Sequence, residues 1–156
     1  MNYFLLIDCV DLLPQLHDRL MIPFAARREL LSPSAPPTVR SWASHLPAWV
    51  EQVDPSSESL EDPRWIGLHP GETAALALAA VHQPIVLLVD ERPARQRALR
   101  QGFSVTGTLG VLDQAAHRNL ISFAAAIENL KRTTFRYPRR LVEALLAQHN
   151  QATRIH

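Results

Sequence analysis

Acidic residues stand next to apolar segments, where several carboxylates can gather and bind a metal ion. Asp8 and Asp90 each directly follow a short apolar run, Glu72 opens a helix-prone segment, and Glu29 lies near the start of another expected helix. Two unit charges about 4 Å apart repel by about 4 kcal/mol at an effective dielectric constant of about 20. A divalent cation removes that cost, so four acids in one cleft predict a metal site.

Each acid also has a simpler interpretation. An aspartate after a strand commonly caps the next helix, which applies to Asp8 and Asp90. The helix dipole favours negative charge at a helix start, which applies to Glu72. Glu29 follows Arg27 and Arg28, as on a solvated helix face with salt bridges. These interpretations leave the convergence of the four acids unexplained.

The donor types favour a hard cation. Ligation by oxygen atoms and water suits Mg²⁺ or Mn²⁺, and the absence of a Cys or His ligand motif disfavours zinc. No two of the seven histidines have HxxxH spacing, so they are expected at the surface or at helix caps. Cys9, the single cysteine, excludes an intramolecular disulfide, suits a reducing compartment and is expected to be a small core residue.

Two apolar runs, 3–7 and 85–89, predict the main strands. Neither run alternates with polar residues, which favours strands buried on both faces of a parallel sheet. Further strands are expected at 49–53 and 103–105. Ligands of such sheets lie beyond the carboxyl ends of the strands, where Asp8 and Asp90 stand.

Helix-forming segments occupy the gaps between these strands. Segment 92–101 has Pro93 in its first turn and Gly102 as a C-terminal cap. Two loops are expected at 33–37 and 53–70, the second of them long and mobile. The expected helices cover residues 71–81, 92–101, 108–119, 123–132 and 139–148.

Length and composition indicate one globular α/β domain. The chain has 156 residues, with 47% hydrophobic and 20% charged residues, and a net charge of +1 that gives no sign of nucleic acid binding. No boundary divides it, so residues 1–150 are expected to form a single domain and residues 151–156 a C-terminal tail. The start lacks a signal peptide pattern, and the longest uncharged run, 73–89, is shorter than the roughly 20 apolar residues of a membrane helix. We expect a soluble, cytoplasmic protein.

An ordered set of motifs resembles PIN-like domains, specifically the group called domain of unknown function 3368, which is related to VapC-type toxins. Together the motifs cover about residues 3 to 146. In chain order they are Ile7-Asp8, Ile22-Pro23, Arg28-Glu29-Leu30, Leu68-His69-Pro70-Gly71-Glu72, Leu88-Val89-Asp90-Glu91-Arg92 and Thr106-Gly107-Thr108-Leu109-Gly110.

The resemblance implies a three-layer α/β/α, Rossmann-like fold with a central parallel sheet. It implies a metal-dependent endoribonuclease, often the toxin of a toxin–antitoxin pair and commonly a homodimer. The family's acidic positions fall on Asp8, Glu29, Glu72 and Asp90, which would be the catalytic residues and would hold Mg²⁺ or Mn²⁺. Glu91 and Asp11 are additional candidates.

Residues around these acids have candidate roles in binding RNA. Arg92 and Arg95 follow Asp90 closely enough to meet a substrate phosphate, with a solvated helix face as the alternative. Thr106 and Thr108 are expected to form a turn and a helix cap, with support of the metal ligands as the alternative. The three tryptophans suit stacking on RNA bases, although packing in the core or a dimer interface is favoured; they are Trp42, Trp49 and Trp65.

Two other functions compete with the nuclease. PIN relatives usually carry Ser or Thr shortly after the first aspartate, and this chain has Cys9 and Val10 there, which favours a PIN-fold binding module with a decayed site. The second is an aspartyl-phosphate protein. Phosphatases of that kind need Asp-x-Asp, and Asp8 and Asp11 are one residue too far apart. Receivers need a lysine near the aspartate, and the chain has only Lys131.

Overall fold

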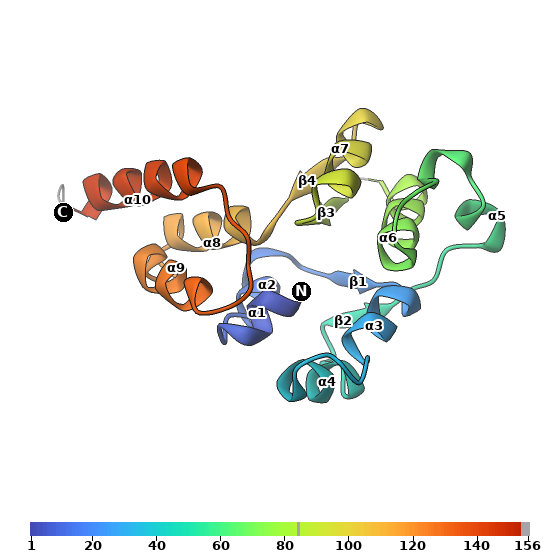
Figure 1. Cartoon of the computed structure of the whole chain (residues 1–156), viewed down its shortest axis with the longest axis horizontal. Helices are drawn as coiled ribbons and strands as arrows, with labels where there is room; N and C mark the ends of the chain where they lie inside the picture. The colour runs from blue at the N-terminus through green and yellow to red at the C-terminus, as the bar shows by residue number, and fades with distance from the viewer. Residues whose placement is uncertain (84, 154–156) are drawn as a thin grey trace. The chain divides into compact units, whose positions relative to one another are not determined.

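The computed structural model describes residues 1–83 and 85–153 (Figure 1). It contains two compact units, and each is described by itself. Residues 17–107 form one of them, called here the α/β unit. Residues 1–16 and 108–156 form the other, called here the helical unit.

The α/β unit contains two parallel strand pairs. Strand β1 (Leu20–Ile22) pairs with β2 (Val50–Gln52), and β3 (Val86–Leu88) pairs with β4 (Ser104–Thr106). Helices connect the strands of each pair, as parallel pairing requires. These helices and their neighbours are α3 (Phe24–Leu30), α4 (Pro37–Ser44), α5 (Ser57–Leu60), the 3₁₀ helix η1 (Pro63–Trp65), α6 (Pro70–Val81) and α7 (Arg92–Arg100).

Helix α6 is central to the α/β unit, since it contacts α3, α5, η1 and β3 (Figure 1). Its sequence is rich in alanine, and small side chains let neighbouring backbones approach closely. Its residues Leu76, Ala77 and Ala79 lie in one buried cluster with Trp65 and Leu87. This cluster fixes the start of α6, which carries Glu72, relative to strand β3, which leads to Asp90.

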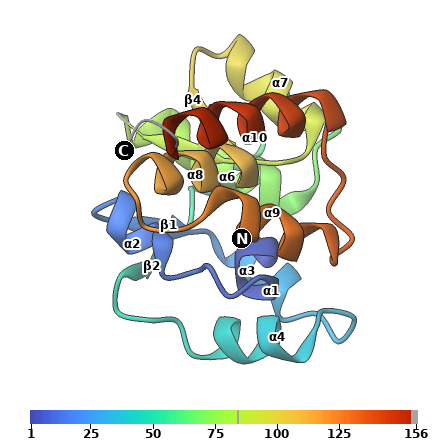
Figure 2. The same cartoon turned by 90° about the vertical axis from the view of Figure 1, so that its left-hand side faces the viewer.

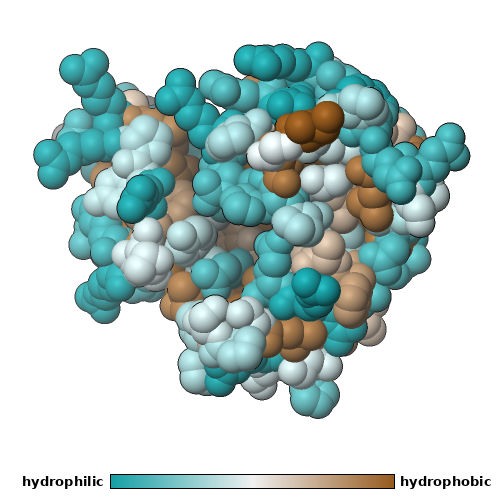
Figure 3. Space-filling model, turned by 45° about the vertical axis from the view of Figure 1, so that its right-hand side comes forward, coloured by the Kyte–Doolittle hydropathy of each residue, from teal (hydrophilic) through white to brown (hydrophobic). Residues whose placement is uncertain are grey.

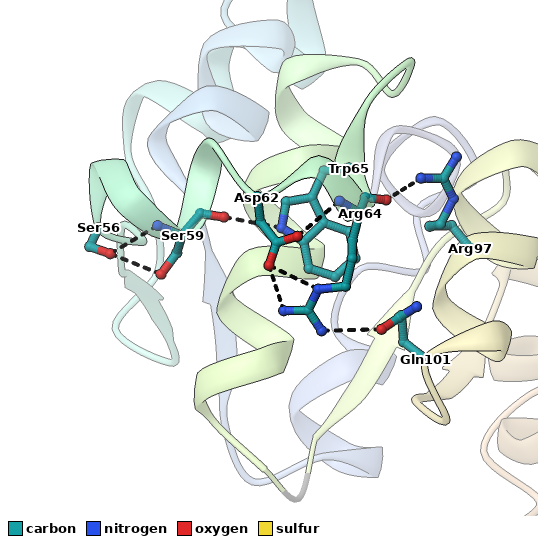
Figure 4. A network of polar contacts seen from close by, with 7 residues as sticks. All are labelled: Ser56, Ser59, Asp62, Arg64, Trp65, Arg97 and Gln101. Atoms are coloured by element: carbon teal, nitrogen blue, oxygen red, sulfur yellow. Dashed lines mark hydrogen bonds and ion pairs between the residues drawn. The ribbon is translucent and has the colours of Figure 1, made fainter.

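A polar network next to Trp65 holds the segment before α6 in place (Figure 4). The Trp65 indole N–H donates to the Ser59 carbonyl at 3.0 Å. The Arg64 guanidinium donates to the Asp62 carboxylate at 2.6 Å and to the Gln101 side chain at 3.1 Å, and it lies over the Trp65 ring. Hydrogen bonds from Arg64 lower the pKa of Asp62. Arg97 of α7 donates to the Arg64 carbonyl.

The elements of the helical unit, within the described residues, are helices (Figure 2). Helix α8 contacts α2, α9 and α10. The core contains Phe4, Leu112, Ile127 and Leu130, each at most 1% exposed. The helices are α1 (Asn2–Leu6), α2 (Leu12–Leu16), α8 (Thr108–His117), α9 (Phe123–Lys131) and α10 (Arg139–Thr153).

The strand predicted at 3–7 is wrong, because residues Asn2–Leu6 form α1. A short continuous apolar run does not separate a buried strand from a buried helix. Of the residues in this run only Ile7 is β-branched, while Leu5 and Leu6 are strong helix formers. Asp8 therefore follows a helix rather than a strand.

The other predicted strands and helices are confirmed, with shifts of a few residues at their ends. Strands β2, β3 and β4 lie at the segments 49–53, 85–89 and 103–105, and their parallel pairing confirms an α/β fold. Helices α6, α7, α8, α9 and α10 match the five predicted helices. Helix α10 extends to Thr153, into the expected tail at 151–156, of which residues 154–156 lie outside the described residues.

The sheet differs in extent from the single central sheet that was expected. Among the described residues the strands form two separate two-stranded sheets. One physical reason is that segment 3–7, expected as a core strand, is helical. Another is that each observed strand is only 3 residues long. The mixed α/β character with parallel strands holds.

The expected long loop at 53–70 is more ordered than predicted. It contains α5 and η1, and Trp65 within it is 2% exposed. Ser56 caps α5 by accepting from the Ser59 N–H, and Asp62 caps η1 by accepting from the Arg64 N–H. These caps and the buried Trp65 indole explain why the segment is ordered, whereas the sequence predicted a mobile loop.

The surface of the protein is mainly polar on the face shown in Figure 3. Hydrophilic side chains cover most of that face, and hydrophobic ones form small separate groups between them. Within residues 1–83 and 85–153, no helix is both long enough and apolar enough to cross a membrane.

Candidate metal centre

Glu29 binds the start of helix α6. Its carboxylate Oε1 accepts the Gly71 N–H at 3.0 Å. A Cβ atom at Gly71 would lie 2.7 Å from that oxygen, so glycine permits the close approach. Glu29 lies in the last turn of α3, not near a helix start as predicted. Its contact is with α6 because α3 packs against that helix.

Glu72 lies in the first turn of the same helix. Its Oε2 atom accepts the His69 N–H at 3.0 Å, which supports the start of α6. Its Oε1 atom is buried and has no hydrogen-bond partner among the residues that the structure describes. A buried, unsatisfied carboxylate oxygen is costly. Capping of α6 therefore explains the position of Glu72 Oε2. Its Oε1 atom would be satisfied by a hydrogen-bond donor or by a cation.

Asp90 follows β3 in the α/β unit, at the carboxyl end of the strand. The Val89 N–H beside it donates to the Thr106 carbonyl at 2.9 Å, so the end of β4 lies next to Asp90. A Cβ atom at Gly107 would be 2.9 Å from Asp90 Oδ1 and 3.5 Å from Arg95 Nη1. Gly107 thus leaves room for a carboxylate and a guanidinium at this strand end.

Asp8 is exposed and adopts a left-handed backbone, with φ of 56°. It comes after the C-terminal cap of α1, where such a conformation often ends a helix. The neighbouring Cys9 thiol donates to the Ile7 carbonyl at 3.5 Å. Burial raises the pKa of Cys9, and the charge of Asp8 raises it further. The thiol is therefore protonated at neutral pH, and Cys9 is half-buried rather than the core residue that was predicted.

The structure brings part of the predicted site together. The Glu29 and Glu72 carboxylates both bind backbone N–H groups at the start of α6, and we call these two residues the α6 acid pair. Asp90 belongs to the same unit, and Asp8 belongs to the helical unit. The common site of all four acids stays a prediction.

The structure gives positions and local contacts for the remaining candidates. Glu91 is the N-cap residue of α7, and its carbonyl accepts the Arg95 N–H at 3.0 Å. The Asp11 carbonyl accepts from the Gln15 side chain at 2.9 Å. Arg92 is exposed at the start of α7. Thr106 ends β4, and Thr108 begins α8 with its side chain fully buried.

The tryptophans differ in exposure. Trp65 is 2% exposed in the core of the α/β unit, which confirms core packing for this residue. Trp42 and Trp49 are half-buried and lie near each other, with ring centroids 6.2 Å apart. Neither of those two lies in the main core.

An apolar hollow of about 460 Å³ lies on the α/β unit. Residues of α3, α5 and α6 line it, among them Phe24, Leu60 and Thr73, and none of the four predicted acids does. The hollow is therefore separate from the four acids, and its apolar walls offer no ligands for a metal ion.

Sequence reasoning missed several residues. Gly71 and Gly107 were noticed only as parts of motifs, and their close carboxylate contacts required coordinates. A group formed by Asp113, His117 and His149 was missed entirely. The chain lacks HxxxH spacing, but Asp113 and His117 have the same four-residue spacing with a carboxylate in the first position.

Comparison with known proteins assigns the family. The family model DUF3368: PIN domain matches residues 1–151. The chain therefore belongs to the PIN domains, a class of proteins that are generally nucleases and usually depend on a metal ion. Within that class its family is DUF3368, as its ordered motifs indicated. No curated protein and no solved structure matches the chain.

Proposed function

We propose that this protein is an endoribonuclease that uses Mg²⁺ or Mn²⁺. The observation that carries the proposal is the buried Glu72 Oε1 atom, which has no hydrogen-bond partner within the described residues. It lies at a helix start to which a second carboxylate, Glu29, is already bound. In a PIN domain, this oxygen is a suitable ligand for a hard cation.

The donor set fits such a cation. Glu29, Glu72, Asp90 and Asp8 would hold it, and all four offer oxygen ligands. When bound, the cation would supply Lewis-acid stabilisation of charge on the phosphoryl oxygens. Gly71 and Gly107 support this fit, because each leaves space where a side chain would press on a carboxylate.

Arg95 suits the binding of the RNA phosphate. Its guanidinium lies beside Gly107 on the side where the Asp90 carboxylate lies, and the side chain is half-buried. A planar guanidinium forms paired hydrogen bonds with phosphate oxygens. Arg92, exposed in the same first turn of α7, would extend this binding surface. Arg97 is less suited, since it already donates to the Arg64 carbonyl.

The decisive experiment is RNA cleavage with Mn²⁺ by the wild type and by the Asp8→Asn, Asp90→Asn double variant. We expect the wild type to cleave and the double variant to be inactive. Equal cleavage by both proteins would end the proposal. A Glu72→Gln variant should also lose activity, and Glu58→Gln is its matched control, because Glu58 also lies in the first turn of a helix but is exposed. Glu58→Gln should keep full activity.

The second candidate is a PIN-fold binding module whose site has decayed. Cys9 and Val10 in place of the usual hydroxyl residue favour it. A cation that binds only the folded state adds about 2.7 kcal/mol of stability at about 100 times its Kd. A rise in the thermal midpoint with Mn²⁺ supports the nuclease. An unchanged midpoint at millimolar Mn²⁺ supports the decayed site.

The biological role proposed for the enzyme is the toxin of a toxin–antitoxin pair, acting as a homodimer on cytoplasmic RNA. Family membership supports this role. We expect a small gene directly upstream. Its product should form a complex with this chain and stop its cleavage of RNA. If expression of the active protein alone does not slow cell growth, the toxin role is contradicted.

A further inference from the structure

A second group of metal-binding side chains lies in the helical unit. Asp113 and His117 are four residues apart on α8, so they share one face of the helix. His149 of α10 meets them, since α10 packs against α8. One ligand atom from each residue can be chosen so that all three lie within 4.8 Å of one another. We call these residues the His–Asp cluster.

The side chains of the cluster are already close to ligand spacing. Asp113 Oδ1 lies 2.7 Å from His149 Nε2 and 3.3 Å from His117 Nδ1. Ligand atoms around one tetrahedral zinc ion, with bonds of about 2.1 Å, lie roughly 3.4 Å apart. Coordination of an ion would need small side-chain movements and the loss of the hydrogen bond between His117 Nδ1 and the Asp113 carbonyl, which is 2.9 Å long.

Surrounding residues hold the cluster in position. The Phe123 ring stacks on His149, with centroids 4.7 Å apart. The His117 and His149 rings meet edge to face at 4.5 Å. The side chains of His149 and Asp113 are 15% and 28% exposed, and that of His117 is 49% exposed. The cluster is thus shielded on one side and open to solvent at His117.

Gln148 provides a partner for the outer side of His117. Its amide nitrogen lies 3.4 Å from His117 Nε2. A metal on Nδ1 would place the ring proton on Nε2, and a rotated Gln148 amide would then accept it through its oxygen. Metal-binding histidines commonly have such a partner on the second ring nitrogen.

A hydrogen-bonded staple between α8 and α10 is the simpler interpretation of the cluster. In it, His149 Nε2 bonds to Asp113 Oδ1, while His117 Nδ1 bonds to the Asp113 backbone carbonyl at 2.9 Å and lies 3.3 Å from the same carboxylate oxygen. Two neutral imidazoles and one carboxylate are also a common donor set for zinc, with water in the remaining position. The two interpretations make different predictions for added metal.

We propose that Asp113, His117 and His149 bind one Zn²⁺ ion and so fasten the C-terminal helix α10 to α8. The site uses none of the four acids of the proposed nuclease centre, so it does not depend on that function. Its nitrogen-containing donor set favours zinc over Mg²⁺. Metal binding would stabilise the helical unit, because the ligands come from two different helices.

The test is a Zn²⁺ titration of the full chain, stripped of metal with a chelator and kept in excess Mg²⁺ to occupy sites made only of carboxylates. We expect one equivalent of Zn²⁺ to bind and to raise the thermal midpoint. His149→Gln and Asp113→Asn should weaken binding by at least about tenfold, since residues that merely support a ligand already contribute about 10- to 100-fold. Co²⁺ in place of Zn²⁺ gives a visible absorption band as a second measurement.

Two further variants keep the test decisive. His45→Gln is the control, because His45 is exposed at the end of α4 in the other unit. His117→Gln serves if the more buried His149 variant fails to fold. Absence of a bound equivalent in the wild type would overturn the proposal. Unchanged zinc affinity in His117→Gln and Asp113→Asn would overturn it too.

Discussion

The α6 acid pair and the His–Asp cluster deal with negative charge in different ways. In the α6 acid pair, the His69 N–H donates to Glu72 Oε2 and the Gly71 N–H donates to Glu29 Oε1. The other Glu72 oxygen, Oε1, has no hydrogen-bond partner in the described part of the chain. In the His–Asp cluster, one aspartate oxygen lies within reach of two imidazoles. The first group leaves one buried oxygen that a donor or a cation would satisfy, whereas the carboxylate of the second already has partners.

This difference in donor atoms sets which metal each proposed site would prefer. Oxygen-only donors select Mg²⁺ or Mn²⁺, and a set with two imidazoles selects zinc and its neighbours. The two groups belong to different units and come from different helices. Substitutions in one group should therefore leave the other group's metal response intact.

The largest expected effect is that a substitution in each group impairs only that group's own function: RNA cleavage for the α6 acid pair, and Zn²⁺ binding for the His–Asp cluster. Glu72→Gln should lower Mn²⁺-dependent RNA cleavage by about a hundredfold or more and leave Zn²⁺ affinity unchanged. His149→Gln should lower Zn²⁺ affinity by at least about tenfold and leave RNA cleavage unchanged. The scale follows from the roughly 10- to 100-fold loss seen when only a supporting residue is removed. Parallel cleavage assays and Zn²⁺ titrations check it, and a loss of both responses in either folded variant would break the comparison.

A large effect on stability is expected in the core of the α/β unit. Trp65→Ala should lower the free energy of unfolding by about 3–5 kcal/mol, because it empties a buried site and frees the segment before α6. Trp49→Ala should cost clearly less, since Trp49 is half-buried. Urea unfolding followed by circular dichroism gives both values. Equal losses would mean that Trp65 does not anchor the frame of the α6 acid pair.

A smaller effect is expected at Gly71, where an added methyl group meets Glu29. Gly71→Ala should cost about 1–2 kcal/mol, because it pushes the Glu29 carboxylate away from the Gly71 N–H. In a Glu29→Ala background the same change should be neutral or stabilising, since alanine favours helices by about 1 kcal/mol over glycine. A double-mutant cycle in urea measures the coupling. Additive effects would show that Glu29 does not bind α6 in solution.

The smallest expected effect concerns the thiol of Cys9. Burial and the Asp8 charge raise its pKa, so the thiolate is scarce at neutral pH and grows only as pH rises past the raised value. Asp8→Asn removes the charge, which lowers the pKa and should modestly speed alkylation at mildly alkaline pH. Mn²⁺ should speed alkylation in the wild type, but not in Asp8→Asn, if the cation binds at Asp8. Mass spectrometry of alkylation against time measures these rates.

The sequence predicted much of the fold because local signals agreed with the structure. The apolar run before Asp90 and the helix that begins at Pro70-Gly71-Glu72 both appear where expected. Segment 3–7 failed because burial alone does not decide between helix and strand in five residues. Strand β1 was missed because it is only 3 residues long and leads straight into Pro23.

The candidate sites were less predictable, because they depend on contacts between distant residues. The sequence marked Glu29 and Glu72 as candidates, but the contact that brings Glu29 to the start of α6 joins it to Gly71, 42 residues further along the chain. His149 lies 36 residues after Asp113, and only the packing of α10 on α8 brings them together. The spacing of Asp113 and His117 was the one local signal for that cluster.

The left-handed backbone at Asp8 decides which substitution can isolate its charge. With φ at 56°, this position is tolerated best by glycine and next by asparagine or aspartate. Asparagine therefore keeps the geometry of the turn while it removes the negative charge. Alanine would add backbone strain to the loss of charge, so an inactive alanine variant would report on the turn as much as on the metal.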